Sequence, residues 1–118
     1  MVTALKIEPN KSPYPCQICD DGDYLNHCVS PDSCLVYTPS ALKIGDHIAA
    51  VYCRNGYIFS LPGNRRVGDQ IICGTFYIVR VKNGKLVSLT DTDVVKYSLE
   101  YWAPESFTEE ELQTSLLF

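Results

Sequence analysis

The chain lacks any apolar run of the length that a membrane-spanning helix needs, which is about 18 or more residues. Its first residues, MVTALKIEPNK, also lack the long apolar region of an export signal and carry charge early. We therefore expect a cytoplasmic protein with no membrane segment. In a reducing compartment, the six cysteines are expected to be thiols or metal thiolates rather than disulfides.

Basic residues are in the minority, because ten Lys and Arg face 14 Asp and Glu and give a net charge of −4. Binding to the nucleic-acid backbone requires clustered Lys and Arg that displace counterions. The charge balance therefore argues against bulk nucleic-acid binding. It leaves room for a local positive site at Arg65 and Arg66 that binds one anionic group.

Groups suited to catalysis are also scarce. The near-neutral proton acceptors are His27 and His47, and no serine in a nucleophile-elbow setting accompanies His47. The carboxylates of residues 20–23 do not complete a calcium-binding EF-hand loop, and helix capping explains them more simply. We therefore expect a protein without enzymatic activity.

Short apolar segments separated by turn residues make up much of the chain, which is typical of a sheet. Asn-Gly pairs at residues 55–56 and 83–84 are strong signals for tight hairpin turns. The continuous apolar segment Ile48–Cys53 is expected to be a central strand that is buried on both faces. Further strands are expected at residues 3–8, 16–19, 33–38, 57–61 and 85–89, and the apolar segment from Gln70 to Lys82 is strand-like.

One main helix is expected at about residues 91–102, because a capping sequence with acidic groups in the first turn precedes apolar residues at helical intervals. Tyr97, Tyr101 and Trp102 are expected to form its packing face. A second, short helix is expected at about residues 22–29.

The C-terminal tail, residues 106–118, has a weak capping box in Thr108 and Glu111 and forms either a last short helix or a frayed end. We expect residues 1–118 to form a single domain, since domains commonly have about 100–150 residues. The expected fold class is α+β, with a mostly antiparallel sheet of five to six strands covered on one face by helices.

Several motifs of the chain occur in the order and spacing of a known family. They are KIEPNKSPYP, Leu61-Pro62-Gly63-Asn64-Arg65, Asp69, Ile72-Cys73-Gly74-Thr75-Phe76, Ser88-Leu89-Thr90-Asp91 and Lys96-Tyr97. Over about residues 4–105 the chain resembles the bacterial and phage family called domain of unknown function 3846. The resemblance implies a small α+β protein of phages and mobile elements, and it implies no reaction and no catalytic residues.

Two adjacent arginines in a glycine-rich turn form the main candidate site. The candidate ligand- or partner-binding residues are Asn64, Arg65, Arg66 and Asp69. In one interpretation, Arg65 forms a bidentate pair with Asp69 or Glu8 and fixes the turn to the first strand. In the other, Arg65 and Arg66 face outward beside glycine amides and bind a phosphate, a carboxylate or an acidic partner surface.

The cysteines suggest a second candidate site. Cys16 and Cys19 have the spacing of a zinc knuckle, and Cys28 or His27, together with Cys34, would complete four ligands for zinc. The later pair is more widely spaced than in zinc knuckles, and the resemblance does not include these cysteines. The alternative is that they are core or surface thiols, as expected for the two remaining cysteines in apolar strands.

The sequence therefore favours a non-enzymatic binding protein of phage or mobile-element type that contacts a host protein or a ligand. A modulator of host defence is one form of this hypothesis. One alternative is a sequestering or regulatory pocket for an anionic, nucleotide-like molecule at Asn64 and Arg65. Another alternative is a small zinc-stabilised interaction module built on residues 16–34.

Overall fold

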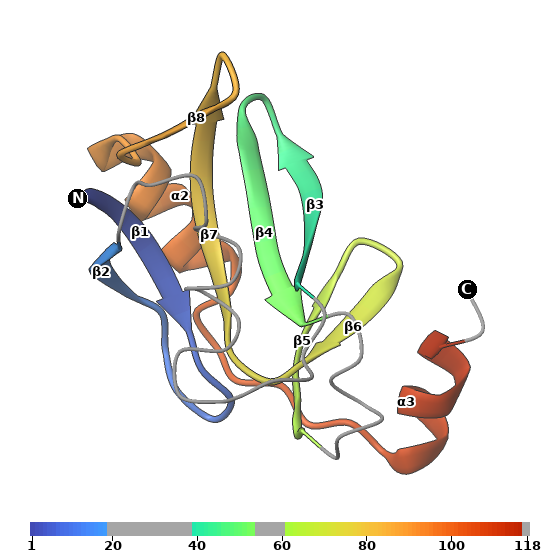
Figure 1. The fold of residues 1–118 in the computed structure, drawn as a ribbon. Coiled ribbons are helices and arrows are strands. Elements are labelled where there is room, and N and C mark those ends of the chain that lie inside the picture. Colours follow the sequence, from blue (N-terminus) through green and yellow to red (C-terminus); the bar gives the residue numbers. More distant parts are fainter. Residues whose placement is uncertain (19–38, 54–60, 117–118) are drawn as a thin grey trace.

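The computed structural model describes residues 1–18, 39–53 and 61–116, and it confirms the α+β class (Figure 1). The strands are β1 (Val2–Ile7), β2 (Tyr14–Ile18), β3 (Pro39–Gly45), β4 (Ile48–Cys53), β5 (Gly63–Val67), β6 (Gln70–Cys73), β7 (Phe76–Lys82) and β8 (Lys85–Val87). The helices are α2 (Asp91–Glu100) and α3 (Glu109–Leu116). The expected helix at about 22–29, the expected strand at 33–38 and nearly all of the one at 57–61 lie outside the described residues.

The main sheet is antiparallel and has the strand order β2-β1-β7-β4-β3, with β8 paired to the end of β7 (Figure 1). These six strands agree with the expected sheet of five to six. Strand β4 lies between β3 and β7, as its continuous apolar sequence predicts. The turn between β7 and β8 has Asn83 at φ 54° and Gly84 at φ 75°, as expected for an Asn-Gly hairpin.

The apolar segment from Gln70 to Lys82 is two strands rather than one. Gly74, at φ 86°, breaks it, so that β6 pairs with β5 in a separate two-stranded sheet and β7 enters the main sheet. A Cβ atom at Gly74 would also lie 2.8 Å from a methyl carbon of Leu61. The expected position of the arginines was wrong as well: Arg65 and Arg66 lie in β5, and the turn follows them at residues 68–69.

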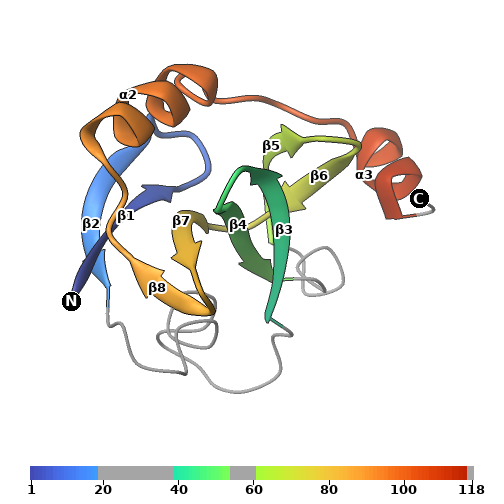
Figure 2. The same ribbon diagram turned by 90° about the horizontal axis from the view of Figure 1, so that it is seen from above.

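Helix α2 covers one face of the main sheet (Figure 2). It begins at Thr90 with a capping box in which the Asp93 side chain takes part. Tyr97 and Tyr101 are buried in the core cluster on this face, and Tyr101 packs edge-on against Phe76. Trp102, expected beside them, is instead 55% exposed and lies directly after the helix C-cap, Tyr101.

Of the two forms expected for the C-terminal tail, the structure has the short helix, α3. The Thr108 N–H donates to Glu111 Oε1 at 2.9 Å and the Glu111 N–H donates to Thr108 Oγ1 at 3.1 Å, which completes the expected capping box. Phe107 and Leu112 pack against Gly63 of β5. In the described part of the chain, no helix is long and apolar enough to cross a membrane.

Candidate functional site

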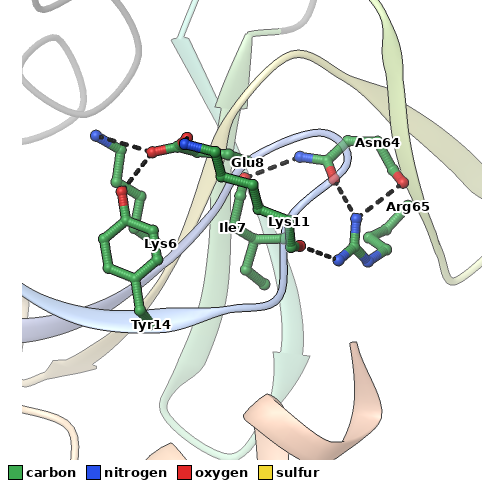
Figure 3. A network of polar contacts seen from close by, with 7 residues as sticks. All are labelled: Lys6, Ile7, Glu8, Lys11, Tyr14, Asn64 and Arg65. Carbon is green, nitrogen blue, oxygen red and sulfur yellow. Dashed lines mark hydrogen bonds and ion pairs between the residues drawn. The ribbon is translucent and has the colours of Figure 1, made fainter. Parts of the chain in front are cut away.

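Asn64 is a fully buried polar residue that joins three parts of the fold (Figure 3). Its Nδ2 atom donates to the backbone oxygens of Ile7 at 2.8 Å and Gly74 at 2.9 Å. Its Oδ1 atom accepts a hydrogen bond of 2.7 Å from Arg65 Nη1. Both the donor and the acceptor of the Asn64 amide are satisfied inside the protein. Asn64 therefore fixes β5 to β1 and to Gly74, which separates β6 from β7.

Arg65 is 1% exposed, and each nitrogen of its guanidinium donates to an oxygen of the protein. Nε donates to the Tyr101 backbone oxygen at 3.0 Å. Nη2 donates to the Lys11 backbone oxygen at 2.6 Å (Figure 3). Nη1 donates to both oxygens of Asn64. Burial lowers the pKa of Arg65, and the nearby Glu105 carboxylate opposes this effect.

The expected ion pair of Arg65 with Asp69 or Glu8 was wrong. Asp69 lies exposed in the turn beyond β5, while Glu8 takes other partners. Tyr14 donates a short hydrogen bond to Glu8, and the ammonium group of Lys11 lies 3.1 Å from it (Figure 3). The hydrogen bonds from Tyr14 and Lys11 hold the pKa of Glu8 below its ordinary value.

The Arg65 guanidinium therefore fixes the C-terminal end of α2. The last carbonyls of a helix have no partner within it, and a cation at that end is favoured by the helix dipole. Arg65 supplies both the donor for Tyr101 and the charge. Since its donors face oxygens inside the protein, the geometry gives Asn64 and Arg65 a bracing role and offers no open anion site at this pair.

Arg66, in contrast, is exposed and faces the segment between α2 and α3. Its backbone N–H donates to Glu105 Oε2 at 2.8 Å, and its guanidinium lies 3.8 Å from Glu111 Oε2. The guanidinium carbon also lies 5.9 Å from the centre of the Phe107 ring. The two adjacent arginines thus contact different parts of the C-terminal region. Arg65 binds the end of α2, and Arg66 contacts the residues that follow it.

Asp69 lines a groove that does not include Asn64, Arg65 or Arg66. The groove has a volume of about 540 Å³ and lies between β3, the turn of the β5–β6 hairpin and the end of α2. Its walls are residues 42–44, 67–70 and 100–101. The structure therefore separates the four expected site residues into a buried pair, an exposed arginine and one groove residue.

The outer side of α2 carries large apolar side chains that the sequence reasoning missed. Val95 is 59% exposed, Leu99 is 70% exposed and Trp102 is 55% exposed. The spacing of four residues places Val95 and Leu99 on one side of the helix, and Trp102 follows the C-cap; we call these three residues the α2 stripe. The signal was present in the sequence, because these positions cannot share a helix face with Tyr97 and Tyr101.

The C-terminal segment that includes the α2 stripe is acidic. Residues 91–111 hold seven of the 14 acidic residues and one of the ten basic residues. The rest of the chain therefore has nine basic and seven acidic residues, a net charge of +2, so the overall charge of −4 arises in this region. Asp91 and Glu100 are exposed on the same helix as the stripe.

The expected zinc site is largely outside the described residues, because Cys19, Cys28 and Cys34 all lie there. Cys16 is half-buried in β2, and burial raises the pKa of its thiol. Within residues 1–18, 39–53 and 61–116, no group of three or more His, Cys, Asp or Glu could hold a metal ion. Zinc binding therefore stays a prediction.

A family model described as domain of unknown function (DUF3846) matches residues 2–101. The match includes every described strand and all of α2, and it ends before Trp102 and α3. No curated protein and no solved structure matches the chain.

Proposed function

The chain belongs to the DUF3846 family, and we propose that it is a non-enzymatic binding protein that contacts a partner protein through the α2 stripe. The observation that carries this proposal is the exposure of Val95 and Leu99 on α2 and of Trp102 directly after its C-cap. Grouped exposed apolar residues often mark interaction sites. Tryptophan is also enriched among the residues that dominate binding energy at protein interfaces.

The stripe is not required for packing of the helix, which supports a role in binding. Tyr97 and Tyr101 already provide the contacts of α2 with the core cluster. Exposed leucine and tryptophan side chains add little to folding, since they stay in water in both states. A partner with an apolar groove would remove them from water and gain that free energy on binding.

Helix α2 is held at both ends, so the stripe is presented by a rigid element. At the N-terminal end, Asp93 accepts from the Thr90 N–H at 2.9 Å and from Arg80 at 3.0 Å. At the C-terminal end, Arg65 holds the Tyr101 carbonyl. Binding by a preorganised helix costs less conformational entropy than binding by a mobile segment.

The charges around the stripe define the partner's chemistry. Asp91 and Glu100, which are exposed on the helix of the stripe, favour a partner whose apolar groove is bordered by Lys and Arg, and Lys96 on the same helix opposes them. The resemblance to proteins of phages and mobile elements makes a host protein the partner that we propose, and a component of host defence is one form of it.

Affinity capture from a bacterial lysate tests the proposal with three versions of the tagged full chain. Wild type and the control Thr92→Ala, an exposed change on the same helix, should retain the same basic protein. Leu99→Ala combined with Trp102→Ala should reduce its recovery by about tenfold or more. With the purified partner, the affinity of wild type should fall as salt rises. Equal recovery by the double variant would contradict the proposal.

A further inference from the structure

We propose that the groove between β3, the β5–β6 turn and the end of α2 binds a small zwitterion of amino-acid or dipeptide type with an apolar side chain. This site is separate from the α2 stripe and does not depend on the proposed function. Its volume of about 540 Å³ lies within the range of small-molecule sites, which is about 300–1,000 Å³.

The groove has apolar walls contributed by three elements. Ile44 of β3, Val67 of β5 and Tyr101 at the end of α2 all line it. The hydrogen bond from Arg65 to Tyr101 connects the helix wall to the hairpin wall, so the groove is formed before a ligand arrives. An apolar side chain of a ligand would be removed from water between these residues.

Gln70 is the groove residue with an unsatisfied polar atom. Its Nε2 atom is buried and has no hydrogen-bond partner among the described residues. A buried N–H without an acceptor costs folding free energy, and such groups call for a specific explanation. Rotation of the Gln70 side chain toward the groove would let a carbonyl or carboxylate oxygen of a bound molecule accept from this N–H.

The charged residues of the groove have both signs. Asp69 in the turn and Glu100 at the end of α2 are its acidic lining residues, and Lys43 on β3 is its basic one. An ammonium group of the ligand suits the two carboxylates. A ligand carboxylate suits Lys43 and the unsatisfied amide of Gln70.

Other ligand classes match the groove less well. An anion such as a phosphate would face the carboxylates of Asp69 and Glu100. A simple cation would offer no acceptor to Gln70, and a purely apolar molecule would leave every polar group unpaired. Burial and the neighbouring Glu100 raise the pKa of Tyr101 to about 12, so its hydroxyl is neutral and adds no negative charge.

Calorimetric titration of the full chain tests this inference with three compounds. They are L-leucine, L-leucyl-L-leucine and N-acetyl-L-leucine amide, which keeps the apolar side chain but has neither charge. We expect saturable binding of at least one zwitterion and binding of the neutral compound that is about tenfold or more weaker. The first two compounds distinguish a site for a free amino acid from a site for a peptide. This comparison needs no variant protein.

Variants of the groove residues then test whether the zwitterion binds in the groove. Asp69→Asn combined with Glu100→Gln should weaken binding of the zwitterion by about tenfold or more, because both carboxylates lose their charge. The control Lys82→Gln combined with Glu110→Gln changes exposed charges outside the groove and should bind as wild type does. Absence of binding by either zwitterion, equal binding of the neutral compound, or unchanged binding by the groove variant would each overturn the proposal. None of these results bears on the α2 stripe, which is tested by partner capture.

Discussion

The Nε atom of Arg65 donates a hydrogen bond of 3.0 Å to the backbone oxygen of Tyr101, the residue that caps the C-terminal end of α2. A residue in a two-stranded hairpin thereby fixes the end of the helix that covers the main sheet. Trp102 follows immediately and is exposed. The same contact therefore supports the fold and sets the position of the surface that we propose for binding.

Replacing Arg65 by Ala should lower the free energy of unfolding by about 3 kcal/mol, because the acceptors that it leaves behind are buried without donors. Urea unfolding followed by circular dichroism measures this change. Arg66→Ala is the matched control. Since Arg66 is exposed, its loss should cost about 1 kcal/mol or less. Equal losses of unfolding free energy in the two variants would contradict a stabilising role for the buried Arg65.

Replacing Leu99 by Ala should change the free energy of unfolding by no more than about 0.5 kcal/mol, because Leu99 is 70% exposed. Tyr97→Ala on the opposite face of α2 should cost about 3–5 kcal/mol, as buried aromatic truncations do. Thermal unfolding of the two variants measures the contrast. A large loss for Leu99→Ala would mean that the stripe is part of the core.

Asp93 should make stability depend on pH. Burial raises the pKa of the Asp93 carboxyl, but hydrogen bonds from Thr90 and the nearby Arg80 outweigh it and hold the pKa below the ordinary 3.8. A lowered folded-state pKa gives stability that is present above 3.8 and is lost as the pH falls through the folded value. Wild type should therefore be more stable than Asp93→Asn at neutral pH. The difference in stability should shrink as the pH falls below 3.8. A difference that grows on acidification would contradict this assignment.

Replacing Gly63 by Val should detach α3 without disturbing the main sheet. A Cβ atom there would lie 2.8 Å from a ring carbon of Phe107 and 3.1 Å from a methyl carbon of Leu112. Hydrogen exchange of the α3 amides should accelerate to nearly the rate of an unfolded segment, while exchange in β7 stays slow. The exposed Gly68 has nothing within 4 Å of such an atom, so Gly68→Ala should leave the exchange of α3 unchanged, although its φ of 61° makes the change strain the β5–β6 turn. Slow exchange of α3 in Gly63→Val would show that this contact does not hold the helix.

The sequence predicted the parts of the fold that have a periodic or turn signal. Ile48–Cys53, the Asn83-Gly84 turn and the capped helix at Asp91 are examples of this. The division of Gln70–Lys82 was missed because a continuous apolar segment shows no change of pattern where the chain moves from one sheet to another. Gly74 was the available signal.

The candidate site was harder to predict, because its strand does not follow the usual alternation of buried and exposed side chains. The register of β5 shifts between Gly63 and Arg65, and the adjacent Asn64 and Arg65 are both buried. Alternation alone would have placed one of them in solvent. The distant acceptors on Lys11 and Tyr101 have no local sequence signal, since they are backbone oxygens.

Trp102 is the one tryptophan of the chain, so its fluorescence reports directly on the α2 stripe. Acrylamide quenching of the full-length protein should be compared with quenching of the same protein in concentrated urea. We predict a quenching constant in the folded state of about half the unfolded value, in line with a side chain that is 55% exposed. A folded-state constant of about a tenth of the unfolded value or less would mean that Trp102 is covered, and it would contradict the claim that the stripe is open to a partner.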